Sequence, residues 1–83
     1  MTQQIATHSF TLVLGGATDL TRDLEDALFE AGCDDALLVC RGGVLYLDFD
    51  REAPTKDAAI HSAIQAVEGA GIGLRVEGVE STD

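Results

Sequence analysis

Basic residues are scarce in this chain, and tryptophan and asparagine are absent from it. Five Lys and Arg residues stand against fifteen Asp and Glu, so the formal net charge is -10 at pH 7. A charge of this sign and size repels phosphate backbones and anionic lipid surfaces. We therefore expect neither direct nucleic-acid binding nor membrane binding by this chain.

Cysteine is also rare. Cys33 and Cys40 are the only two, and they do not form a CxxC motif. Such usage is typical of reduced thiols and argues against a disulfide framework or a zinc site. We expect both side chains to pack as small hydrophobes.

Long apolar runs are missing as well. No stretch approaches the roughly 20 residues of a transmembrane helix, and the Met-Thr-Gln-Gln start lacks a basic region followed by an apolar run. This pattern predicts a cytoplasmic location. Aromatic residues are limited to three Phe and one Tyr, so Leu, Val, Ile and Ala must supply most of the core.

What the chain does contain is a regular succession of apolar patterns with periods of two or of about 3.6 residues. These patterns predict, in order, a strand over 8–14, a helix ending at Gly32, strands over 36–41 and 44–50, a helix opened by Pro54 and Thr55, and a strand over 74–79.

This order of elements is that of an α+β, ferredoxin-like βαββαβ sandwich. Right-handed crossovers then give a four-stranded antiparallel sheet in the order 4-1-3-2, with two helices on one face. We expect a single domain over residues 8–80, between flexible ends at residues 1–7 and 81–83.

The clearest local signal is the Gly42-Gly43 pair between two apolar runs. Two glycines suit a type I′ turn, because both central residues of this turn need a positive φ. A two-residue loop pairs Arg41 with Val44 and fixes the register of the whole hairpin.

This register predicts an apolar patch on the helix-free face of the sheet. An exposed apolar patch of this kind most often marks a partner surface, and a second copy of the chain is the simplest partner. The alternative is that long side chains cover the patch. We expect a homodimer through this face, with the interface formed by Val13, Leu37, Val39, Val44 and Tyr46.

Three alternating carboxylates, Asp48, Asp50 and Glu52, give the chain its one catalytic hypothesis. If they converged on Mg²⁺, they would support metal-dependent phosphotransfer or hydrolysis. The alternative is a strand end made soluble by its carboxylates, with Arg51 as their local counter-ion. We favour this alternative and expect no metal site.

A second candidate site is the loop after the first strand, formed by Gly15, Gly16, Ala17, Thr18 and Asp19. Free amides at a helix start hold small anions, and regulatory domains of the ACT type bind ligands at the equivalent loop. The alternative is plain capping of the helix by Thr18 or Asp19. We expect no cofactor at this loop.

Two activities found on the same fold are excluded by missing residues. Acylphosphatase chemistry requires an asparagine, and the chain has none. Copper chaperones carry a CxxC motif in the first loop, which here contains no cysteine. We therefore expect a non-enzymatic interaction or dimerisation module.

In four stretches, residues 26–36, 47–54, 62–64 and 67–68, the sequence resembles the amino-terminal region of small, largely uncharacterised bacterial proteins. In those proteins a predicted helix-turn-helix segment often follows the last strand, which implies that the region is the sensing or dimerising half of a regulator. That segment is absent from these 83 residues.

Overall fold

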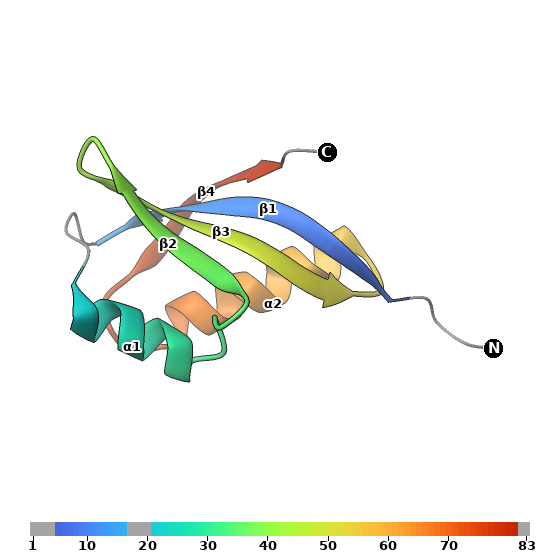
Figure 1. The fold of residues 1–83 in the computed structure, drawn as a ribbon, viewed down its shortest axis with the longest axis horizontal. Helices are drawn as coiled ribbons and strands as arrows, with labels where there is room; N and C mark the ends of the chain where they lie inside the picture. Colours follow the sequence, from blue (N-terminus) through green and yellow to red (C-terminus); the bar gives the residue numbers. More distant parts are fainter. Residues whose placement is uncertain (1–4, 17–20, 82–83) are drawn as a thin grey trace.

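Six elements follow one another in the predicted order in the computed structural model of the chain, which describes residues 5–16 and 21–81 (Figure 1). The sheet order β2-β3-β1-β4 is the predicted order read from the other edge, and every pair is antiparallel. The elements are β1 (Ala6–Gly15), α1 (Arg22–Glu30), β2 (Ala36–Arg41), β3 (Val44–Ala53), α2 (Lys56–Glu68) and β4 (Arg75–Ser81).

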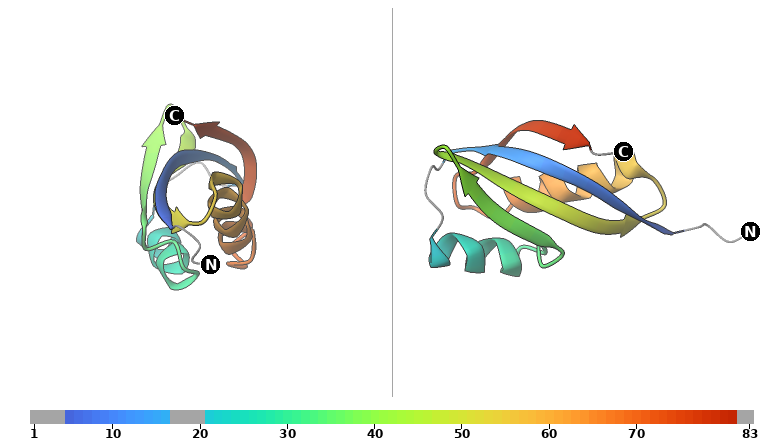
Figure 2. Two further views of the ribbon diagram at one scale, coloured as in Figure 1. Left: turned by 90° about the vertical axis from the view of Figure 1, so that its right-hand side faces the viewer. Right: turned by 45° about the horizontal axis from the view of Figure 1, so that its top comes forward.

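Both helices lie under the same face of the sheet, which curls over them (Figure 2). The longer helix, α2, packs against β1, β3 and β4 and buries Ala59, Ala63 and Val67. The shorter helix, α1, lies near β2 and buries only Leu28. Since α1 offers a single fully buried side chain, its attachment to the sheet is the weaker of the two.

The β2–β3 hairpin has the predicted register, with Arg41 opposite Val44 and Ala36 opposite Phe49. Its two turn glycines have φ angles of 57° and 78°, as a type I′ turn requires. The hairpin prediction is therefore confirmed residue by residue.

The first and last strands extend further than the alternation predicted. β1 starts at Ala6 rather than His8, because Ala6 and Thr7 pair with the last residues of β3. β4 continues to Ser81, which lies opposite Phe10. Pairing partners that are distant in sequence thus lengthen both strands.

The predicted start of α1 is wrong. Its N-cap is Thr21, whose hydroxyl accepts a hydrogen bond from the backbone N–H of Leu24 at 3.2 Å. Thr18 and Asp19, the predicted caps, lie outside the described residues. The predicted end is confirmed, since Gly32 follows the C-cap Ala31 with a φ of 101°.

The core lies between the sheet and the helices. Phe10 and Phe49 pair across β1 and β3 and stack with ring centroids 5.3 Å apart. Cys33 is buried as expected, but Cys40 is exposed, so the prediction that both cysteines pack as hydrophobes is wrong for Cys40. The buried residues are Phe10, Leu12, Leu14, Leu28, Cys33, Leu45, Leu47, Phe49, Ala53, Ala59, Ala63, Val67 and Leu74.

Candidate functional site

The five predicted interface residues form one continuous patch on the helix-free face, called here the outer-face patch. The pairing registers place Val39, Tyr46 and Val13 in a single row across β2, β3 and β1. Val44 lies in the row nearest the hairpin turn, and Leu37 lies in the row on the other side. Leu37 is 65% exposed, whereas the other four side chains are half-buried.

Opposite charges border the two ends of the outer-face patch. Near the hairpin turn, the Arg41 guanidinium lies over the Tyr46 ring, 4.9 Å from its centroid. In the row beyond Tyr46, Asp48 and Glu80 lie on either side of Thr11. The patch is therefore apolar in its middle, basic at one end and acidic at the other.

The carboxylates of β3 do not converge. Asp48 accepts a hydrogen bond from Thr11 at 2.7 Å, and Asp50 accepts one from Ser9 at 2.6 Å. Glu52 lies one further step along the strand, opposite Thr7, and each two-residue step is about 6.6 Å. Among residues 5–16 and 21–81 no group of three or more His, Cys, Asp or Glu is placed to hold a metal ion. Asp48 and Asp50 therefore serve as cross-strand hydrogen-bond acceptors.

The described part of the glycine loop is shaped by close chain packing. A Cβ on Gly15 would collide with the carboxylate of Glu77, and one on Gly16 with the backbone carbonyl oxygen of Gly73. Gly16 also has a φ of 97°. Ala17, Thr18 and Asp19, the rest of the predicted ligand loop, lie outside the described residues. Since Glu77 brings a negative charge to Gly15, the visible part of the loop disfavours an anionic ligand.

Arg51 does not neutralise the neighbouring β3 carboxylates, as had been predicted, because its side chain lies on the other face of the sheet. Its Nε and Nη2 atoms donate to the Asp35 carboxylate at 2.7 and 2.9 Å. Nη2 also donates to the Gly32 carbonyl at 2.6 Å, and Nη1 donates to the Ser62 hydroxyl at 3.1 Å. Its guanidinium lies 4.9 Å from the Phe49 ring centroid. Arg51 thus connects the loop after α1 to β3 and α2.

The same contacts set the protonation of the neighbouring groups. The hydrogen bonds from Arg51 lower the pKa of Asp35, and the Asp35 carboxylate raises the pKa of Arg51. Burial raises the pKa of the Cys33 thiol. The Arg51 charge offsets part of this rise, and the Asp35 and Asp34 charges add to it. Cys33 is therefore a poor nucleophile at neutral pH.

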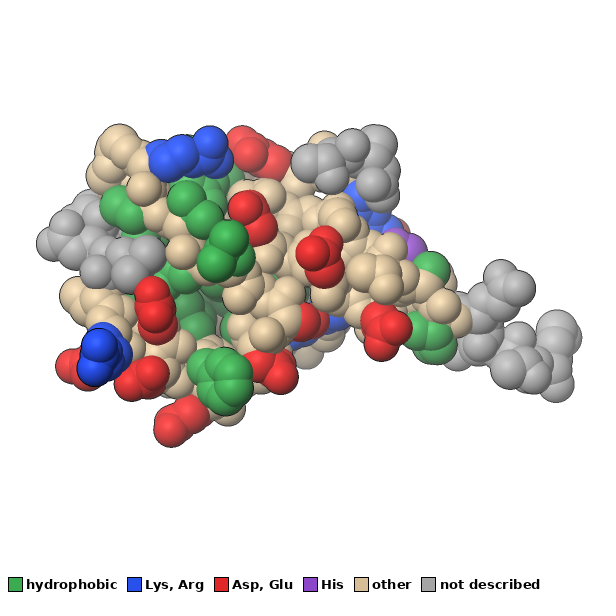
Figure 3. Space-filling view, viewed as in Figure 1, with side chains coloured by type: hydrophobic (Ala, Val, Ile, Leu, Met, Phe, Trp, Pro, Cys, Tyr) green, Lys and Arg blue, Asp and Glu red, His purple; other side chains and the backbone are tan. Residues whose placement is uncertain are grey.

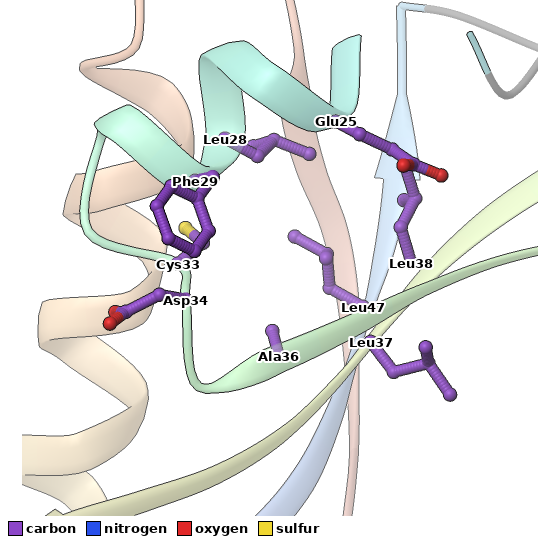
Figure 4. Close-up of a pocket in the computed structure, with 9 residues that line it drawn as sticks. All are labelled: Glu25, Leu28, Phe29, Cys33, Asp34, Ala36, Leu37, Leu38 and Leu47. Carbon is purple, nitrogen blue, oxygen red and sulfur yellow. The ribbon is translucent and has the colours of Figure 1, made fainter. Parts of the chain in front are cut away.

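A pocket that the sequence did not predict lies between α1 and β2 (Figure 4). Its volume is about 190 Å³. Phe29, at 66% exposure, is on the α1 side of this pocket, and its position off the apolar stripe of the helix was the one sequence signal of a feature here. The lining residues are Glu25, Leu28, Phe29, Cys33, Asp34, Ala36, Leu37, Leu38 and Leu47.

Hydrophobic side chains gather in the half of the molecule that holds α1 and the hairpin, among scattered carboxylates (Figure 3). No helix within the described ranges is both long enough and apolar enough to cross a membrane. No family model matches the chain, and neither a curated protein nor a solved structure is significantly similar to it. The family resemblance stated above stays a prediction.

Proposed function

We propose that this chain is a non-enzymatic interaction module of the ferredoxin-like class that forms a homodimer in the cytoplasm through the outer-face patch. The observation that carries the proposal is the continuity of Val13, Leu37, Val39, Val44 and Tyr46 across three neighbouring strands. A single 83-residue domain buries a modest core, so a partner on this face also adds stability.

The charges that border the patch select one arrangement of the two copies. A two-fold axis that lies between the sheets and runs across the strands reverses the strand direction and keeps β2 over β2, so Arg41 of each copy lies over Leu37 and beside Asp48 of the other. An axis along the strands instead places Arg41 opposite Arg75, which occupies the hairpin end of β4. The first arrangement pairs opposite charges and offsets part of the repulsion between two chains of charge -10.

The proposal gives the dimer a regulatory role. The family resemblance supports this role, because the matching region in those bacterial proteins precedes a predicted DNA-binding segment. Dimerisation of such a region sets the spacing of two DNA-binding segments.

The first test is the solution mass of the chain, measured by sedimentation over a wide concentration range at low and high salt. We expect a dimer that tightens with salt, because screening reduces the repulsion between the acidic chains. Tyr46→Lys and Val39→Lys should each give a monomer with an unchanged circular dichroism spectrum. Thr7→Lys, which adds the same charge to the same face outside the patch, is the matched control. A wild-type chain that stays monomeric at every concentration contradicts the proposal.

A charge exchange tests the arrangement of the copies. Arg41→Glu should weaken the dimer about tenfold at low salt, and the added substitution Asp48→Lys should restore it. If Arg41→Glu weakens the dimer and Asp48→Lys does not restore it, the two copies are related by a different axis.

A further inference from the structure

The α1–β2 pocket has an apolar base, and its volume is that of one large side chain. Leu28, Cys33 and Leu47 lie at this base and are 3%, 5% and 2% exposed. The volume of about 190 Å³ exceeds the roughly 150 Å³ of apolar cavities that bind benzene. One phenyl or leucyl group therefore fits.

An unpaired strand edge runs along the same pocket. β2 pairs with β3 on one side, and no strand of the described chain pairs with its other side. The backbone N–H of Asp50 donates to the carbonyl of Asp35 at 3.1 Å, so Asp35 and every second residue after it bond to β3. Leu38 falls between these residues, and its backbone N–H and C=O point to the open edge. Because the Leu38 side chain lines the pocket, a strand added here lies directly beside it.

The two ends of the pocket are acidic. Glu25, from α1, lies beside Leu38 at one end, and Asp34 lies beside Cys33 at the other (Figure 4). Both residues are exposed, as is Phe29 between them. An exposed carboxylate therefore lies beyond each end of the pocket, where it can be reached by the residues that flank an inserted apolar side chain.

We propose that β2 and the α1–β2 pocket bind an extended, basic segment of another protein, which adds to the sheet as a fifth strand. One large apolar side chain of the segment enters the pocket, and Lys or Arg residues two positions before and after it face Asp34 and Glu25. Main-chain bonds to β2 give affinity, and the pocket and its charges give specificity. A second copy of this chain does not fit this description, because it carries fifteen acidic and five basic residues. This surface shares only Leu37 with the outer-face patch, and the proposal does not depend on the homodimer.

The test uses the full chain and the capped peptide acetyl-Thr-Lys-Thr-Phe-Thr-Lys-Thr-amide, whose Phe and two Lys side chains share one face of a strand. Binding is followed by amide chemical shifts at low salt. We expect a dissociation constant below about 1 mM, with shifts at Leu38, Phe29 and their neighbours. The same peptide with Glu in place of Lys should bind at least tenfold more weakly.

Two N-methylated forms of the peptide test the added strand. Methylation of every second amide removes either the donors that face β2 or those that face solvent. One form should therefore lose binding, and the other should keep it. Equal binding by both forms, or no binding by the parent peptide, overturns the proposal.

Variants of the chain locate the site. The pair Glu25→Lys and Asp34→Lys should weaken peptide binding about tenfold, and Phe29→Ser should also weaken it. The matched control is Asp23→Lys with Glu30→Lys, which changes the charge equally on exposed positions of α1 outside the pocket lining. Equal loss in the control overturns the charge assignment.

Two further outcomes name a different occupant and overturn the proposal. If phenethylammonium binds the same residues as tightly as the peptide, the pocket is a site for small organic cations. If Phe29→Ser turns a wild-type dimer into a monomer, a second copy occupies the pocket.

Discussion

Arg51 donates two parallel hydrogen bonds to Asp35, from Nε to Oδ2 at 2.7 Å and from Nη2 to Oδ1 at 2.9 Å. The Arg51 side chain is 13% exposed and that of Asp35 is 31% exposed, so water screens this pair only in part. The same guanidinium bonds to Gly32 and Ser62. It therefore connects β3 both to the turn that closes one end of the pocket and to α2.

Removal of the carboxylate charge at Asp35 should destabilise the fold. Asp35→Asn leaves the guanidinium without its anionic partner, and we expect the free energy of unfolding to fall by about 1–3 kcal/mol. Urea unfolding of the wild type and the variant measures this change in the free energy of unfolding. Glu77→Gln breaks the exposed ion pair with Arg75 and is the control, with an expected change below about 0.5 kcal/mol. Equal losses in the two variants would show that burial of the Arg51–Asp35 pair adds nothing.

The same pair predicts a dependence of stability on pH. Because Arg51 lowers the pKa of Asp35 in the folded state, the unfolded chain binds this proton more readily. The stabilisation is therefore present above the unfolded pKa of about 4, and it disappears as the pH falls through the lower folded pKa. Urea unfolding of the wild type and Asp35→Asn should give a constant difference between about pH 5 and 7 that shrinks in acid. A difference that stays constant into strong acid would refute this linkage.

Two glycines should respond differently to the same substitution. Gly16→Ala places a Cβ against the Gly73 carbonyl in a backbone with a positive φ, and we expect a loss of about 2–4 kcal/mol. Gly42→Ala meets no atom within 4 Å and should cost only about 1 kcal/mol for its φ. Gly42→Asn should be close to neutral, because Asn accepts this conformation in a type I′ turn. Thermal unfolding compares the stabilities of the three variants. Equal losses of stability in Gly16→Ala and Gly42→Ala would contradict the close contact between Gly16 and the Gly73 carbonyl.

The two thiols should react at very different rates. Cys40 is exposed, whereas Cys33 is buried and burial raises its pKa. Iodoacetamide at pH 8 should label Cys40 within minutes and Cys33 only when the chain unfolds. Mass spectrometry of digested peptides, with Cys40→Ser as the control, gives both rates. Rapid labelling of Cys33 in the folded chain would show that the loop after α1 opens readily.

Local signals predicted the parts of the fold that depend on local geometry. The Gly42-Gly43 turn fixes the hairpin register by itself, and the alternating runs on either side assign the faces. The start of α1 was not predictable, because Thr18, Asp19 and Thr21 are all good N-cap residues. Thr21 is the cap, and Leu24 and Leu28 in the turns that follow it pack against the core.

The sequence predicted the members of the outer-face patch, because strand register alone determines which side chains share a face. It did not predict the partner of Arg51, since Asp35 lies sixteen residues away and the contact requires a bend between α1 and β2. The pocket was missed for a similar reason. Its volume depends on how far α1 lies from β2, and Phe29 off the apolar stripe showed only that this side of the helix was unusual.

The first strand, β1, occupies a central position in the sheet, between β3 and β4. Leu12 pairs with Leu47 on one side and with Val79 on the other. Both pairing partners are therefore synthesised well after Leu12. During synthesis on the ribosome, both edges of β1 therefore stay open until β3 and then β4 have emerged. Because synthesis at about 5–20 residues per second is much slower than chain collapse, these edges stay open for seconds, and β1 is the segment that a chaperone would meet exposed.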